Sequence, residues 1–133
     1  MFKNEKFEIQ FLTDRIYRLK VFEGAEIEAD DANEMGKILR ELSNGKPFAV
    51  LLNAMSSFYI SPDANKIIAS KKDRIAAAIV TKSLANRIIG NFFIKFNKPA
   101  TPTKLFSEET EAMEWLEQLV KEHKEVSLTS IVN

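Results

Sequence analysis

Hydroxyl-bearing residues follow two of the predicted strands, and they are the first candidates for chemistry in this sequence. Ser56, Ser57 and Ser61 come after one apolar run, and Thr81 and Ser83 come after the next. In open parallel α/β sheets, ligands bind beyond the carboxyl ends of the strands, where helices present free backbone N–H groups. The spacing therefore predicts an edge that holds an anion or accepts a phosphoryl group. A structural role stays open as well, because Ser61 and Ser83 stand where helix N-caps are expected.

The second candidate is apolar surface on a predicted helix from about residue 84 to 96. At 100° per residue its apolar side chains cover roughly half of the helix circumference, more than packing on one sheet requires. They are Leu84, Ala85, Ile88, Ile89, Phe92, Phe93 and Phe96. Some of this surface is therefore predicted to stay exposed, unless a neighbouring element of the same chain covers it. Exposed, it would serve as a homodimer seam, a protein-binding face or one wall of a pocket for an apolar ligand.

Residues that catalysis and metal binding most often use are scarce. The chain has one histidine, His123, four scattered glycines and no cysteine. His123 is expected near the end of the last helix, where the helix dipole favours a cation, so its position needs no catalytic explanation. We find no nucleophile motif, glycine-rich phosphate loop or metal-ligand spacing. The sequence therefore predicts no catalytic residue, no cofactor and no metal, and a protein that is not an enzyme; an enzyme of unspecified reaction is the remaining alternative.

Length and charge restrict the class of protein further. The 133 residues, 45% of them hydrophobic, suit one domain spanning 1–133. Lys plus Arg and Asp plus Glu number 19 each, so no net charge attracts nucleic acid. The longest apolar runs are about six residues, whereas a membrane span needs about twenty. With no apolar signal segment at the start of the chain, we predict a cytoplasmic protein without a membrane span.

The elements that must position these candidates begin with a hairpin and a helix. Apolar and polar residues alternate over 7–11 and, less strictly, over 16–22, and Thr13-Asp14 lies between these two predicted strands. A helix follows, for which Asp30 and Asp31 offer an N-cap. Its apolar face is Met35, Ile38, Leu39 and Leu42, and its stop signal is Asn44-Gly45 followed by Pro47.

From residue 48 onward the chain repeats a strand and then a helix. Apolar runs predict strands at 48–52, 75–80 and 104–106. Helices are predicted to start after Ser61, after Ser83 and within the acidic segment 107–111. The order β-β-α-β-α-β-α-β-α predicts an α/β domain with four helices and a mixed, mostly parallel sheet of about five strands.

This order resembles the STAS domain, the fold of bacterial anti-sigma-factor antagonists. The resemblance rests on Val50-Leu51-Leu52-Asn53 and on Phe58-Tyr59-Ile60-Ser61 before a short helix. Residues 104–116 look like the ending of the antagonist-like branch grouped with SEC14-type lipid-binding domains, in which an Ala-x-x-Trp-Leu motif packs the last helix. Residues 89–99 are similar to a segment of small uncharacterised bacterial proteins in that branch. The motif places Trp115 and Leu116 in the core.

One feature departs from this family. Antagonists controlled by phosphorylation carry a Ser or Thr in an Asp-Ser-x-Gly-like turn, and here Ser61 aligns with the Asp and Pro62 with the modified position. Proline cannot be phosphorylated, so Ser56, Ser57 or Ser61 would have to substitute.

The resemblance implies a regulator that acts through protein contacts or self-association, or alternatively a binder of a lipid or another apolar small molecule. A binder needs a cavity of roughly 300 Å³ or more beside the helix at 84–96. Bulky Phe92, Phe93 and Phe96 would fill much of such a space. We therefore expect an exposed contact patch rather than a cavity.

Overall fold

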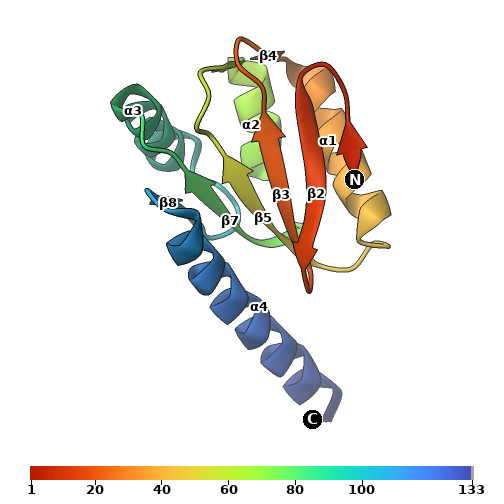
Figure 1. Cartoon of the computed structure of the whole chain (residues 1–133). Helices are drawn as coiled ribbons and strands as arrows, with labels where there is room; N and C mark the ends of the chain where they lie inside the picture. Colours follow the sequence, from red (N-terminus) through yellow and green to blue (C-terminus); the bar gives the residue numbers. More distant parts are fainter. Residues whose placement is uncertain (133) are drawn as a thin grey trace.

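The computed structural model describes the backbone of residues 1–132 and the side chains of residues 1–128. It is a mixed α/β structure with helices on both faces of a central sheet (Figure 1). The central strands are β1 (Phe2–Lys3), β2 (Phe7–Thr13), β3 (Ile16–Val21), β5 (Phe48–Asn53), β7 (Arg74–Val80) and β8 (Thr103–Phe106). A separate pair consists of β4 (Glu26–Ile27) and β6 (Tyr59–Ile60). The helices are α1 (Ala29–Leu42), α2 (Pro62–Ser70), α3 (Leu84–Phe92), the π-helix η1 (Phe93–Asn97) and α4 (Glu109–Val132).

The sheet has the predicted mixed, mostly parallel topology. Its strand order is β1-β2-β3-β5-β7-β8. Strands β3, β5, β7 and β8 are parallel neighbours, whereas β2 is antiparallel to both β1 and β3. All five predicted strands are present, and the hairpin turn lies at Asp14-Arg15, one residue later than predicted. The prediction missed β1 and the parallel β4–β6 pair, because two-residue strands leave no periodicity to detect.

Helix α1 begins earlier than the aspartates suggested. Its N-cap is Glu28, and Asp31 occupies the third helical position, from which its carboxylate accepts the Glu28 N–H at 2.9 Å. This reciprocal arrangement is a capping box. Asp31 also pairs with Lys6 at 2.7 Å, so it ties the start of α1 to the first hairpin. The predicted stop is confirmed, because Asn44 and Gly45 both adopt positive φ.

The sheet separates two hydrophobic clusters. One lies beneath α1 and α2 and includes Phe7, Tyr17, Phe48 and Val50. The other lies beneath α4, with Leu51, Ala76, Ala78 and Leu116. Alternate residues of β5 serve opposite clusters, which explains the continuous apolar run that predicted a strand covered on both faces.

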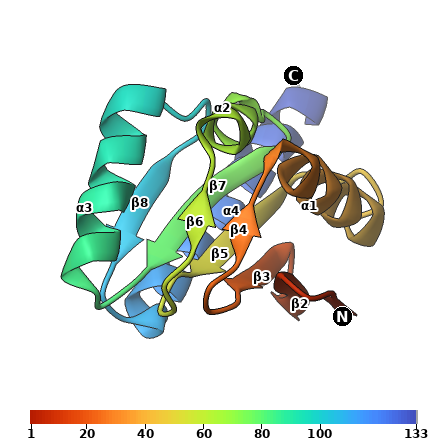
Figure 2. The ribbon, with the colours of Figure 1, turned by 90° about the horizontal axis from the view of Figure 1, so that it is seen from above.

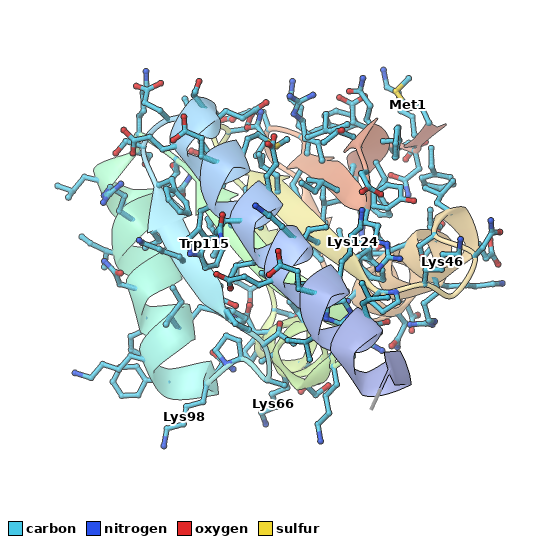
Figure 3. All side chains as sticks on the ribbon, turned by 90° about the horizontal axis from the view of Figure 1, so that it is seen from below. Met1, Lys46, Lys66, Lys98, Trp115 and Lys124 are labelled. Atoms are coloured by element: carbon cyan, nitrogen blue, oxygen red, sulfur yellow. The ribbon has the colours of Figure 1, made fainter. Side chains whose placement is uncertain are left out.

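Helix α4 crosses the face of the sheet opposite α1 and α2 (Figure 3). Leu116 is fully buried, as predicted, whereas Trp115 is only partly buried at the edge of the cluster, with its ring 5.6 Å from that of Phe106. The helix continues to Val132, so His123 lies more than two turns before its end. The position of His123 is therefore not explained by the helix C-terminus, contrary to the expectation.

Candidate functional site

Helix α3 stands apart from α1 on the same side of the sheet (Figure 2), and η1 leads back toward α2. In Figure 2, α1 and α3 lie at opposite sides of the view, with β4 and β6 between them. The predicted single helix at 84–96 is an α-helix only to Phe92, after which the chain continues as a π-helix to Asn97 and turns at Lys98 with φ 49°. Short π segments inside helices are often found at functional sites.

Three contacts hold this segment in place. At its start the Asn86 side-chain amide donates to the carbonyls of Ala54 and Ser56 at 2.9 and 3.0 Å. In its middle, Gly90 lies against Leu105 of β8 so closely that a methyl group in its place would come within 2.8 Å of a Leu105 methyl carbon. Beyond its end the Ala100 N–H donates to the Ala69 carbonyl of α2 at 2.8 Å. The segment is thus fixed at both ends and touches the sheet closely at a glycine.

An apolar cavity of about 340 Å³ lies between this segment, α1, α2 and the sheet. Its sheet wall includes Leu19, Val50, Leu52, Ala77 and Ile79, and its helical walls include Met35, Leu39, Ile68, Ile89 and Phe93. Mid-sheet Ala77 and Ile79 keep some exposed surface, whereas Ala76 and Ala78 on the opposite face have none. The difference indicates that α1, α2 and α3 leave space over this part of the sheet, while α4 leaves none.

Two cationic side chains mark one end of the cavity. Lys71 follows α2 and Arg74 begins β7, and both line the cavity. The Arg74 side chain is 11% exposed, its Nε donates to Asp73 at 3.3 Å, and its guanidinium carbon lies 5.6 Å from the centre of the Phe48 ring. Burial lowers the pKa of Arg74 below its ordinary value, and the charge of Asp73 opposes that shift. The Lys71 stem runs beside Gly36 of α1.

The outer face of α3 and η1 is apolar and exposed. Leu84 is 74% exposed, and Ile88, Ile89, Phe92 and Phe96 are each 59–60% exposed. The rings of Phe92 and Phe96 lie 4.2 Å apart, centre to centre. Surplus apolar surface was thus correctly predicted, but two residues of the stripe also border the cavity: Phe93, which is partly buried, and Ile89, which remains 60% exposed. The role of the exposed face stays a prediction.

The hydroxyl edge is mostly used by the fold itself. Ser61 and Ser83 cap α2 and α3 by accepting the N–H groups of Ala64 and Asn86. Thr81 is fully buried and accepts the Ser83 N–H. Ser56 is partly exposed and Ser57 is exposed, so the prediction of a modified or anion-binding hydroxyl now rests on these two.

Metal-binding groups and membrane-spanning helices are absent from the described part of the chain. Among those residues, no group of three or more His, Asp or Glu side chains is placed to hold a metal ion. His123 is partly exposed on α4, on the far side of the sheet from the cavity. No described helix has the length and apolar character needed to cross a membrane.

Comparison with known proteins identifies the family and the fold. A model of a domain of unknown function, DUF7793, matches residues 9–120, so the chain belongs to this family. The structure is similar to that of an uncharacterized protein of the DUF3478 family from Shewanella loihica PV-4, which has a SpoIIAA-like fold. The TM-score is 0.58 at 17% identity, over 87% of this chain and 98% of that one. The STAS-like fold expected from the sequence is thereby confirmed.

A second solved structure, of a protein with unknown function from Arthrobacter sp. FB24, is 25% identical over 83% of this chain and 98% of that one, with a TM-score of 0.32. No curated protein matches the chain.

Proposed function

We propose that this domain binds an apolar small molecule in the cavity beneath α3, without catalysis. The observation that carries the proposal is the cavity of about 340 Å³, walled mainly by aliphatic and aromatic side chains. Ligand sites are typically concave, mostly apolar spaces of about 300–1,000 Å³ with a few polar groups that orient the ligand. From the sequence we expected an exposed contact patch rather than a ligand cavity. We now prefer the ligand cavity, because Phe92 and Phe96 point outward and do not fill the space.

The arrangement of α3 and η1 supports the same proposal. The segment is anchored at its start by Asn86 and beyond its end by Ala100, and Ile89 and Phe93 face the cavity between these anchors. Because it is anchored at both ends, the segment can cover a bound molecule without being packed into the hydrophobic core. The cavity is also close to the minimum volume of a ligand site, so we expect a small ligand.

Native mass spectrometry of protein purified from its own host tests the proposal. The expected result is a stoichiometric apolar adduct, or uptake of one molecule of added decan-1-ol by unliganded protein. Unliganded protein that takes up no decan-1-ol from a saturated aqueous solution would contradict it.

A second candidate function is contact with protein, first of all with a second copy of the chain, through the exposed face of α3 and η1. The observation that favours it is the group of five large apolar side chains, each at least 59% exposed. Patches of this kind mark interaction surfaces on soluble domains. Light scattering during gel filtration would then give about twice the 15.1 kDa of one chain, whereas a mass of one chain at micromolar concentration would exclude the homodimer. A regulatory role in the cytoplasm remains a prediction from the sequence.

A further inference from the structure

We infer that the ligand of this cavity is an anionic amphiphile, with a carboxylate at Lys71 and Arg74 and its apolar body along the sheet. This inference rests on the proposed function, and it adds the chemical class of the ligand and the direction in which the ligand lies.

Sheet register places the charged groups at one end of the cavity. Ala77 of β7 is aligned with Thr103 of β8, and the Ala77 N–H donates to the carbonyl of Pro102. Arg74 lies three residues before Ala77, so it stands at the amino edge of the sheet, where the cavity is also lined by Thr101 and Thr103. Lys71 reaches the same edge from the end of α2.

All charged side chains in the described lining are cations. Lys71 and Arg74 line the cavity, and no Asp or Glu does. Asp73 pairs with Arg74 on one side and with Arg40 at 3.4 Å on the other. Lys71, Arg74 and Arg40 therefore stand against one carboxylate, which leaves an excess of positive charge at this end. An anion matches the sign of that excess.

The donors at this end are available to a ligand. Arg74 uses Nε for Asp73, and neither of its two terminal nitrogens has a partner among the described residues. The Lys71 ammonium likewise has none in the described part of the chain. No buried side-chain nitrogen or oxygen in the described structure lacks a partner, so these donors keep access to the cavity or to solvent. A guanidinium edge and an ammonium together suit a planar carboxylate.

An uncharged ligand would fit this end poorly. A purely apolar molecule in the cavity would displace water from two cations and return no hydrogen bond, which costs free energy. A carboxylate compensates that loss because hydrogen bonds between charged partners are the strongest that side chains make. Charge therefore selects the head group, while the apolar walls select the body of the ligand.

The cavity volume sets the size of the ligand. At about 30 Å³ per heavy atom, the volume that a molecule of liquid water occupies, 340 Å³ holds about eleven heavy atoms. Decanoate is close to this size, and decan-1-ol and decylammonium have the same chain with a neutral or a cationic head. These three compounds are the probes.

Isothermal titration calorimetry of the full chain with the three probes tests the inference. We expect decanoate to bind about tenfold more tightly than decan-1-ol, and decylammonium to bind most weakly. Lys71→Met, which keeps an unbranched side chain of similar length, should remove most of the preference for decanoate over decan-1-ol by weakening decanoate binding. Lys72→Met is the matched control, because Lys72 is an exposed neighbour that does not line the cavity.

The outcomes separate this inference from the proposed function. Equal binding of decanoate and decan-1-ol, or a preference for decylammonium, would overturn the anionic head group and leave an apolar binding site standing. An unchanged preference in Lys71→Met, or an equal loss in Lys72→Met, would overturn the placement at Lys71. Failure of all three probes to bind would overturn the proposed function together with this inference.

Discussion

Replacing Ala77 by isoleucine should fill part of the cavity and stabilise the unliganded protein. Ala77 lies in the middle of the sheet, between β5 and β8, and borders the cavity. Isoleucine adds three carbons, and burial of each contributes about 0.8 kcal/mol, so the free energy of unfolding should rise by up to about 2.4 kcal/mol. The three carbons need about 90 Å³ at roughly 30 Å³ each, well within the space present. Isoleucine also suits a strand better than alanine.

Ala78→Ile is the matched control for this variant. Ala78 is the next residue along β7, points to the opposite face and has 0% exposure against α4. The same three carbons must be forced into a filled core there, which typically costs 1–3 kcal/mol. Urea unfolding should therefore show changes of opposite sign for the two variants. Ala77→Ile should also weaken decan-1-ol binding at least tenfold, while Ala78→Ile should not affect it in the folded protein.

Destabilisation of both variants to the same extent would refute the reasoning, because it would mean that no usable space borders Ala77. Unchanged decan-1-ol binding in Ala77→Ile would show that the ligand occupies another place.

Three further predictions follow from the same structure. Leu116→Ala should lower the free energy of unfolding by about 3–5 kcal/mol in urea, because its side chain is fully buried beneath α4; a loss below about 1 kcal/mol would show that α4 is peripheral. Phe92→Glu should convert a homodimer to a monomer in light scattering without unfolding it, because Phe92 is 59% exposed; an unchanged mass with a folded circular dichroism spectrum would exclude this face as the seam. Burial raises the pKa of Asp31, but hydrogen bonds from Lys6 and from the Glu28 N–H outweigh it and leave the pKa below its ordinary 3.8. The stabilisation from Asp31 is therefore present above about pH 4 and lost as the pH falls through the lowered value, so Asp31→Asn should show a weaker loss of stability on acidification than the parent in thermal melts from pH 5 to 2.

Local rules in the sequence determined most of the fold. Period-two alternation at 7–11 and the apolar run at 48–52 are properties of neighbouring residues, and both predict strands without knowledge of their partners. The stop at Asn44-Gly45 depends only on backbone conformations that these two residues tolerate. The strand and helix order then implies a mostly parallel sheet, because parallel strands need a crossover between them.

The sequence predicted only part of the candidate site. The apolar stripe at 84–96 predicts surplus surface, but it cannot say which side of the helix meets the sheet. Tertiary packing decided that, because Gly90 permits a close approach to Leu105 and so turns Phe92 and Phe96 outward. Gly90 carries no side chain that a search for apolar periodicity could detect.

The cavity and its cationic end exist only in the folded chain. Lys71 and Arg74 follow a short helix in the sequence, where charged residues are commonplace. Parallel pairing of β7 with β8 and the spacing between α2 and η1 bring them to one end of an apolar space. Such spaces arise from distances between elements far apart in the chain, and no local pattern records those distances. The sequence thus determined which elements form and which of them carry excess apolar surface, whereas tertiary structure alone decided that a cavity lies beneath that surface and which charges face it.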